Sequence, residues 1–361
     1  MAWPVSEFEA VAREDCRAEV DRLVAAVMGA PVTAPQDPRL FLDIARLNRL
    51  LMHPDLPPLG GALQDELDHF RARSKRGIVQ HLTAARDISE SLTKAGIVHF
   101  HFKGPLLQYR IHGSALRKHS YDIDLLVHPD QRREAGQVLT EAGYVATEEE
   151  LGSWWTTFLS ERHFVHPEHG TVIDLHHGLQ QAGLPRPRNI ADFLARRETL
   201  AYFGTEFSVP STPDMCLISA ITVLKAFMAQ DPAGAAVFDL HRLSRSLSSE
   251  DRARLRGYAR ESGLTETLDF ALVLAQVAFE QPLTHTLPDW MPPPEALRAM
   301  LWQPWRADLH FPRRRHVLAW LCSYRPDRMA REMSRAALSD SYRVFLGWWQ
   351  NRQDSTRQVL S

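Results

Sequence analysis

Two aspartates, Asp122 and Asp124, are separated by a single residue in the run DIDLLV. The apolar residues around them, among them Ile123 and Leu125, predict a strand packed on a core and not a solvated strand edge. Side chains alternate between the two faces of a strand, so both carboxylates share one face with Cα atoms about 6.5–7 Å apart. Like charges raise each other's pKa, and a divalent cation between them removes that cost. The pair predicts a metal site.

A third carboxylate, Asp174, lies in another strand-like run, TVIDLH. Three carboxylates on neighbouring strands suit Mg²⁺ or Mn²⁺, and two such ions can hold the attacking and leaving oxygens of a phosphoryl or nucleotidyl transfer. We expect Asp122 and Asp124 to bridge the ions, and Asp174 to ligate one ion and help deprotonate a hydroxyl. The simpler alternative for Asp174 is a strand aspartate bonded to a loop. His176 shares a face with Asp174 and is expected to orient that carboxylate or touch substrate.

A glycine turn precedes the acidic strand and predicts a place for phosphates. Gly104 lets the backbone approach a triphosphate, the helix that follows adds a favourable dipole, and Lys103 can meet the phosphates. Arg117 and Lys118 stand just before the acidic strand, where they can neutralise a leaving pyrophosphate. Pro105 suits the first turn of a helix but lacks an N–H, so one phosphate contact is missing.

Tyr121 and Lys225 complete the predicted nucleotide-binding set. Tyr121 directly precedes the acidic strand, and Lys225 lies in the apolar run TPDMCLISAITVLKAFMA. A buried charge needs a partner, so Lys225 either pairs with Asp239, another charged residue in an apolar run, or reaches the nucleotide.

Five histidines within a short stretch raise the alternative of a zinc site. They are His163, His166, His169, His176 and His177. The first two are three residues apart and so face opposite ways on a strand, and no helical His-Glu-x-x-His motif accompanies them. The pattern does not favour zinc.

The elements that must position these residues predict an α+β protein in three parts. Residues 1–96 show helical periodicity, which begins near residue 5 and ends in a long helix over 63–96. Residues 97–183 carry strand, glycine turn, helix, acidic strand and a hairpin. Residues 184–361 are predicted helical, with Thr212 as the cap of the apolar helix and Pro213 at its first position.

Composition narrows the class of protein. The chain of 361 residues is 44% hydrophobic and 24% charged, values of an ordinary globular protein. Its net charge of −2 gives no global attraction to nucleic acid, and its three cysteines suggest no disulfide framework. The chain shows neither a signal-peptide pattern nor a membrane span, so we expect a cytoplasmic protein.

The order of these motifs resembles the polymerase-beta-like nucleotidyltransferase superfamily, and within it a family of uncharacterised bacterial nucleotidyltransferases. The resemblance rests on Lys103-Gly104, Tyr109, Arg117, the run Asp122 to Val127, Ala142-Gly143-Tyr144, and Ile173 to His176. It implies a small mixed nucleotidyltransferase sheet, flanked by a helical N-terminal region and a helical C-terminal domain.

The resemblance also implies metal-dependent transfer of a nucleoside monophosphate from an NTP, with ATP expected, and release of pyrophosphate. The acceptor hydroxyl or phosphate is expected on a peptide, protein or small molecule. RNA is the least favoured acceptor, because no RNA-binding module is recognisable. Two alternatives stay open: a catalytically inactive nucleotide-binding or regulatory module, and a toxin-type enzyme acting on tRNA. The sequence does not indicate an oligomeric state.

Overall fold

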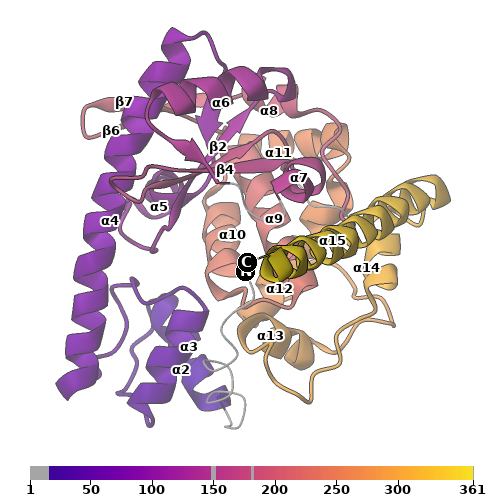
Figure 1. Cartoon of the computed structure of the whole chain (residues 1–361). Helices are drawn as coiled ribbons and strands as arrows, with labels where there is room; N and C mark the ends of the chain where they lie inside the picture. The colour runs from indigo at the N-terminus through magenta and orange to yellow at the C-terminus, as the bar shows by residue number, and fades with distance from the viewer. Residues whose placement is uncertain (1–15, 148–151, 180–182, 361) are drawn as a thin grey trace.

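The computed structural model describes residues 16–147, 152–179 and 183–360 (Figure 1). Helices and a small sheet form an α+β protein, as predicted. The expected start of the helical periodicity near residue 5 lies outside the described residues. The first part of the chain contains the helices α2 (Arg17–Val27), α3 (Pro38–Leu47) and α4 (Gly61–Lys94).

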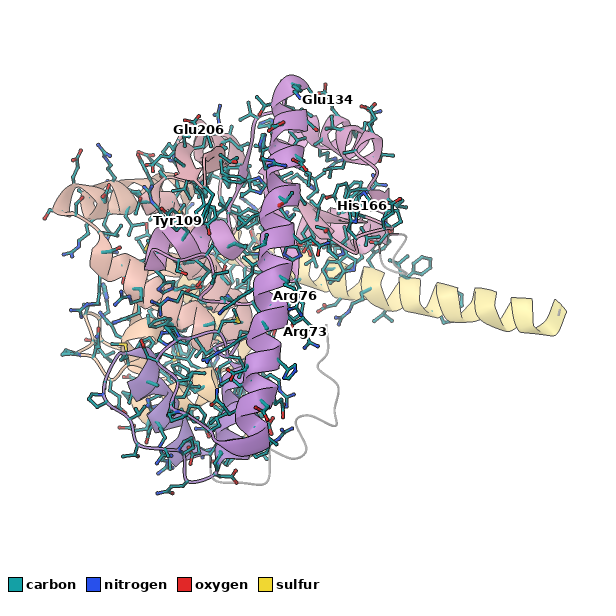
Figure 2. All side chains as sticks on the ribbon, turned by 90° about the vertical axis from the view of Figure 1, so that its left-hand side faces the viewer. Arg73, Arg76, Tyr109, Glu134, His166 and Glu206 are labelled. Atoms are coloured by element: carbon teal, nitrogen blue, oxygen red, sulfur yellow. The ribbon has the colours of Figure 1, made fainter. Side chains whose placement is uncertain are left out.

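The helix α4 has 34 residues and runs along one side of the molecule, with Arg73 and Arg76 on its length (Figure 2). It ends as the sequence predicts, because Gly96, which follows the C-cap Ala95, takes a φ of +72°. The following residue, Ile97, then returns its N–H to the carbonyl of Leu92 over 2.9 Å. The chain passes from this stop into the first strand of the sheet.

The main sheet has five strands in the order β1-β2-β5-β4-β3. Only the central pair, β2 and β5, is parallel, and the other neighbours are antiparallel. This is the small mixed sheet that the resemblance implied. The strands are β1 (His99–His101), β2 (Asp122–Val127), β3 (Val145–Ala146), β4 (Glu161–Val165) and β5 (Val172–His176).

The two faces of the sheet have different neighbours. On one face lies α6 (Arg132–Glu141), where a Cβ added to Gly136 would be 3.4 Å from the ring of Phe164. The polar face carries Asp124, Asp174 and His176, and is turned toward α9 (Thr212–Ala229). The site therefore lies between the sheet and the C-terminal helices. Shorter elements complete this region: α5 (Gly104–His112), η1 (Pro129–Gln131), α7 (Gly152–Trp154), the π-helix η2 (Trp155–Leu159) and α8 (Ile190–Ala195).

The C-terminal part is built on α9, whose predicted cap is wrong by one residue. Ser211, and not Thr212, is the N-cap, because its hydroxyl accepts the backbone N–H of Asp214. By length and composition α9 could cross a membrane, but 67% of it is buried inside the protein, as in a core helix. The helices after it are α10 (Gly234–Ser246), α11 (Ser249–Ser262), α12 (Thr265–Ala278), α13 (Pro294–Trp302), α14 (Arg314–Leu321) and α15 (Pro326–Leu360).

A second sheet corrects the prediction that the chain is helical after residue 184. The strands β6 (Glu198–Tyr202) and β7 (Thr205–Val209) form an antiparallel hairpin that packs against β1 and α4. Its two-residue turn is formed by Phe203 and Gly204, both at positive φ. The alternating apolar residues Leu200, Phe207 and Val209 are the pattern that indicates this hairpin.

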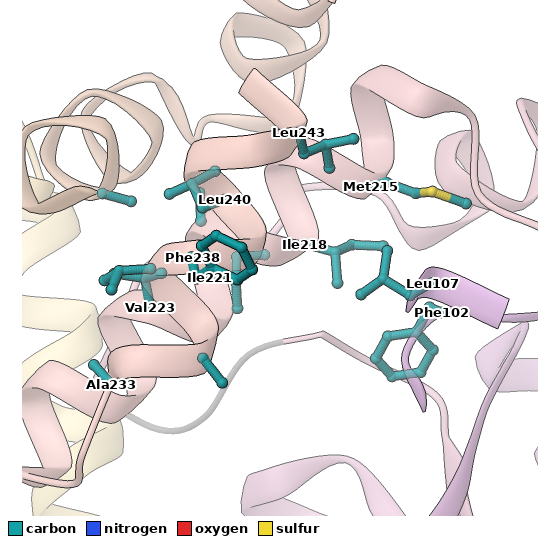
Figure 3. Close-up of a cluster of buried hydrophobic side chains, with 14 of the residues drawn as sticks. Phe102, Leu107, Met215, Ile218, Ile221, Val223, Ala233, Phe238, Leu240 and Leu243 are labelled. Atoms are coloured by element: carbon teal, nitrogen blue, oxygen red, sulfur yellow. The ribbon is translucent and has the colours of Figure 1, made fainter. Parts of the chain in front are cut away.

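One continuous hydrophobic core joins the three parts of the chain. Phe102 and Leu107, from the sheet region, lie beside Met215, Ile218 and Ile221 of α9 (Figure 3). Side chains of α2, α3 and α4 belong to the same cluster. Because the core is shared, the helices on both sides hold the sheet in a fixed position.

Candidate active site

The three predicted carboxylates lie on the two parallel strands. Asp124 of β2 is directly opposite Asp174 of β5, and Asp122 precedes Asp124 on the same face. Asp124, Asp174 and His176 each offer a ligand atom, and these atoms lie within 4.8 Å of one another. Asp122 is not part of that group. The structure thus brings Asp124 and Asp174 together, with Asp122 at the start of the strand.

The protonation equilibria of these carboxylates fit a cation site. Burial raises the pKa of Asp174 to about 8, and the charges of Asp124 and Asp122 add to the shift. Burial, followed by the charge of Asp124, also raises the pKa of Asp122. A divalent cation would relieve both effects, and carboxylate oxygens are the ligands that Mg²⁺ and Mn²⁺ prefer.

Asp124 is held by two cationic or polar groups. Lys103 donates to its Oδ1 over 2.7 Å, and Nε2 of His176 lies 3.1 Å from the same oxygen. Burial opposes ionisation of Asp124, but the Lys103 ammonium and His176 outweigh it and hold its pKa well below the usual range. His176 was expected to orient Asp174 or touch substrate; its ring instead reaches the neighbouring strand and contacts Asp124, and the contact with substrate stays a prediction.

Glu161, which the sequence analysis did not name, and His163, which it considered only for zinc, extend the polar contacts on this face. Glu161 Oε2 lies 3.3 Å from Nδ1 of His176, and Glu161 Oε1 lies 3.5 Å from Nε2 of His163. The same His163 nitrogen is 3.8 Å from Oδ1 of Asp174. Burial opposes ionisation of Glu161, but His163 and His176 lower its pKa to about 2.

The sequence signal for Glu161 was the alternation of β4. Glu161 and His163 are two residues apart and therefore share a face. The hairpin register then places Glu161 opposite His176 and His163 opposite Asp174. If the strand is taken to start at His163, and not at Glu161, Glu161 falls outside the strand and its shared face is overlooked.

The glycine turn lies against the acidic strand. Gly104 has a φ of +65°, and a Cβ at this position would be 3.2 Å from Ser120 Oγ. That hydroxyl in turn donates to the backbone oxygen of Asp122 over 2.8 Å. The helix α5 begins at Gly104 with Pro105 in its first turn, as predicted. The turn is therefore tied to the strand that carries the carboxylates.

Lys225 lies beside this centre and does not pair with Asp239. It lines a narrow crevice together with Lys103 and His176. Burial and the charge of Lys103 lower the pKa of Lys225 to about 8, against the attraction of Glu161 and Asp124. The alternative of a Lys225 pair with Asp239 is wrong, because the carboxylate of Asp239 is bonded elsewhere. Its partners are Gln108 at 3.0 Å, His112 at 3.1 Å and Lys118 at 3.8 Å.

The other predicted nucleotide-binding residues surround the start of β2. Arg117 and Lys118 are half-buried, and Lys118 faces Asp239. Tyr121 is 66% exposed, with its ring 4.0 Å from the ring of His119. Within the described part of the chain, no hydrogen bond or ion pair joins Arg117 or Tyr121 to the three carboxylates.

The clustered histidines do not form one zinc site. His163 and His176 belong to the polar ring described above, whereas His166 and His169 lie at the hairpin turn with Glu168. The rings of His166 and His169 stack at 4.3 Å with an interplanar angle of 11°. His166, Glu168 and His169 each offer a ligand atom within 4.8 Å of the others, so this turn is a second group that could hold a metal ion, separate from the group at Asp124.

Comparison with known proteins identifies the family. Residues 37–280, more than half of the chain, match the family described as "Uncharacterised nucleotidyltransferase". The chain belongs to this family. The match spans the sheet, the glycine turn and the helices α9 to α12. No curated protein sequence matches the chain.

Two solved structures are similar over about half of the chain. The solution structure of the antibiotic-resistance factor ANT(2'')-Ia is 14% identical, with a TM-score of 0.35, and the match covers 52% of this nucleotidyltransferase and 92% of that chain. An antigenic nucleotidyltransferase-like protein from Paracoccidioides brasiliensis is 16% identical, with a TM-score of 0.32, and the match covers 52% and 90%. At these TM-scores neither likeness supports an inference about substrate.

Proposed function

We propose that the protein transfers a nucleoside monophosphate, with ATP as the expected donor, in a reaction that depends on Mg²⁺ or Mn²⁺. The observation that carries the proposal is the opposed pair Asp124 and Asp174 on parallel strands, with Lys103 on Asp124. Asp122, Asp124 and Asp174 would hold the ions. Bound there, the cations would stabilise the charge that develops on the transferred phosphoryl group and the leaving pyrophosphate.

Each residue of the site has its own proposed role in the transfer. Gly104 and Lys103 hold the phosphates of the NTP, and Lys225 lies where it can meet them from the α9 side. An oxygen of the acceptor attacks the α-phosphorus as the bond from that phosphorus to the β-bridging oxygen breaks. Pyrophosphate leaves with the bonding electrons, and Asp174 takes the proton of the acceptor hydroxyl. We expect Arg117 and Lys118 to neutralise the charge of the pyrophosphate.

The acceptor that we propose is a hydroxyl or phosphate of a peptide, protein or small molecule. The net charge of −2 supports this choice over RNA, because binding to RNA draws much of its affinity from basic surfaces. Growth arrest on expression, with labelled tRNA, would identify a toxin-type enzyme in place of this one.

The test compares label transfer by the wild type and by the double variant Asp122→Asn/Asp124→Asn. Each of the four α-labelled NTPs is incubated with Mg²⁺ and cell lysate, and the labelled species is identified. We expect transfer to fall by about 10²–10³-fold or more in the variant. The matched control is Asp130→Asn, a carboxylate in η1 that is 90% exposed and should leave transfer unchanged. Unchanged transfer in the double variant would overturn the assignment.

A second candidate function is nucleotide binding without turnover. It is favoured by the same Lys103 contact, which together with His176 occupies one oxygen of Asp124, and by the N–H that Pro105 lacks. Calorimetric binding of ATP with Mg²⁺, but without pyrophosphate release over a broad panel of acceptors, would support this candidate.

A further inference from the structure

A cavity of about 490 Å³ lies apart from the carboxylates, where β5 ends and α6 begins. Its polar lining includes Arg132, Arg186, Thr157, Ser160 and His177. Its volume falls in the range of small-molecule sites. The described residues that line it include no aspartate or glutamate, so the cavity presents hydrogen-bond donors and positive charge without a lining carboxylate.

Two guanidinium groups line this cavity, and within the described part of the chain neither Arg132 nor Arg186 forms an ion pair. Arg186 donates from Nη2 to the backbone oxygen of Phe158 over 2.8 Å, and its Nε is buried with no hydrogen-bond partner. Arg132 is exposed, and in the described part of the chain its side chain makes a hydrogen bond only to the ring of His177, at 3.5 Å. The buried donor that nothing in the described fold satisfies is therefore Nε of Arg186, while the donors of Arg132 face solvent at the cavity.

The wider surroundings do not cancel this charge. Burial lowers the pKa of Arg186 to about 10, and the positive charge of Arg335 adds to the shift. The carboxylate that acts on Arg186 is Glu332 of α15, which lies outside the cavity lining. Burial raises the pKa of Glu332, whereas the charges of Arg335 and Arg186 oppose that shift. In the described part of the chain Glu332 forms no ion pair with Arg186. Two arginines without an ion pair in a concave site favour an anion.

The cavity borders the narrow crevice lined by Lys103, His176 and Lys225, but it is separate from that crevice. Gly178 and Leu179 line both spaces, and they form the wall between them. That wall is tightly packed, because a Cβ on Gly178 would come within 2.8 Å of the Cβ of Ser160. Next to this wall lie His176, which contacts Asp124, and Glu161, which contacts His176.

We propose that this cavity is a second ligand site, which binds a small molecule carrying a phosphate group. Two guanidinium groups together with the hydroxyls of Thr157 and Ser160 offer more donors than a carboxylate accepts, whereas a phosphate has three terminal oxygens and up to two charges. The cavity is also larger than a bare phosphate, so it has room for the organic part of a phosphate ester. This site does not depend on the transfer reaction proposed above.

The test is calorimetric titration of the full-length protein, in EDTA and without nucleotide. The probes are glycerol 3-phosphate and inorganic phosphate, with glycerol as the uncharged control. We expect the wild type to bind the ester more tightly than inorganic phosphate, and not to bind glycerol. Arg132→Ala should weaken ester binding at least tenfold. Arg186→Lys, which keeps the charge but loses the fork of donors, should weaken it several-fold.

The matched control is Arg188→Ala, which removes an exposed arginine two positions from Arg186 and outside the cavity lining. It should bind the ester within twofold of the wild type.

Thermal melts establish that each variant is folded. If Arg186→Lys does not fold, Arg132→Ala decides the result, because in the described chain the side chain of Arg132 bonds only to His177. No binding by the wild type, or equal binding by Arg132→Ala, would overturn the proposal. If the ester bound at the phosphate site of Lys103 and Gly104 and not in this cavity, Arg132→Ala would leave its binding unchanged, and this too would overturn the proposal.

Discussion

Glu161 shows how a residue outside the predicted site can determine the state of a residue within it. Its carboxylate lies against His176, and His176 lies against Asp124. With a carboxylate on each side, the His176 ring is fixed in orientation, and the side chain of Asp124 with it. Glu161 is therefore a positioning residue, and it acts through His176.

We predict that Glu161→Gln lowers kcat/KM for nucleotidyl transfer by about 10–100-fold, the usual effect of losing an outer partner of a ligand. The apparent Mg²⁺ affinity, measured from the metal dependence of the rate, should fall as well. Glu90→Gln, at an exposed position of α4, is the control and should change neither quantity. A fall in thermal stability with unchanged metal dependence would show a merely structural role.

The raised pKa of Asp174 predicts that metal binding at the proposed site depends on pH. Its pKa is raised to about 8 in the folded protein, above an unfolded value near 3.8. Between these values the folded state binds more protons than the unfolded state, so this residue lowers the free energy of unfolding as pH rises from about 4 to 8. A cation competes with the proton. Hence we predict that the Mg²⁺-induced rise in Tm, measured by scanning calorimetry, is larger at pH 8.5 than at pH 6.

The variant Asp174→Asn separates this effect from other titrating groups. In EDTA its Tm should exceed that of the wild type by an amount that grows from pH 5 to pH 8.5, because the variant has no carboxylate to ionise. The Mg²⁺ effect on its Tm should be small at every pH. A Mg²⁺ shift of equal size at pH 6 and pH 8.5 in the wild type would contradict the assignment.

At the scale of elements, the turn between β1 and α5 depends on Gly104. A side chain there would have a left-handed φ and would press on Ser120, the residue that holds the start of β2. We predict that Gly104→Ala lowers the free energy of unfolding by about 1–3 kcal/mol, measured by urea denaturation, and weakens nucleotide binding. The turn and the acidic strand would shift together.

Gly77→Ala is the matched control for this change. Gly77 lies inside α4, has no positive φ, and a Cβ there would meet nothing within 4 Å. Alanine favours a helix interior over glycine, so the control should raise the free energy of unfolding by about 0.5–1 kcal/mol. Equal effects of the two substitutions would show that the turn is not strained by a side chain.

At the scale of the whole molecule, Asn48 joins the N-terminal helices to the C-terminal ones. It is 1% exposed, donates to the backbone oxygens of Ile44 and Trp302, and accepts the N–H of Gly234. We predict that Asn48→Ala lowers the free energy of unfolding by about 2–4 kcal/mol, because buried groups lose their partners. Asn189→Ala, which removes an exposed cap of α8, should cost only about 1 kcal/mol.

The shared core also predicts how the protein unfolds. Buried side chains from all three parts of the chain form one cluster, so the helices and the sheet should unfold together. Asn48→Ala should accordingly lower the Tm seen by far-ultraviolet circular dichroism and by tryptophan fluorescence equally. Two separate transitions in the wild type would contradict a single cooperative core.

The sequence by itself determined the elements of the site. Alternation in DIDLLV fixes the shared face of Asp122 and Asp124, and Gly104 followed by Pro105 fixes a turn into a helix, because both depend on local backbone geometry. The run around Asp174 is recognisable as a strand for the same reason. These local signals are sufficient to place the chain in its family.

Only the tertiary structure decided which residues touch. The parallel pairing of β2 with β5 places His176 on Asp124, and the register of β4 brings Glu161 and His163 to the same face. The partner of Asp239, the hairpin of β6 and β7, and the cavity of Arg132 and Arg186 likewise depend on contacts between distant segments. Strand order and helix packing are set by the burial of the whole core, and no local window of sequence contains that information.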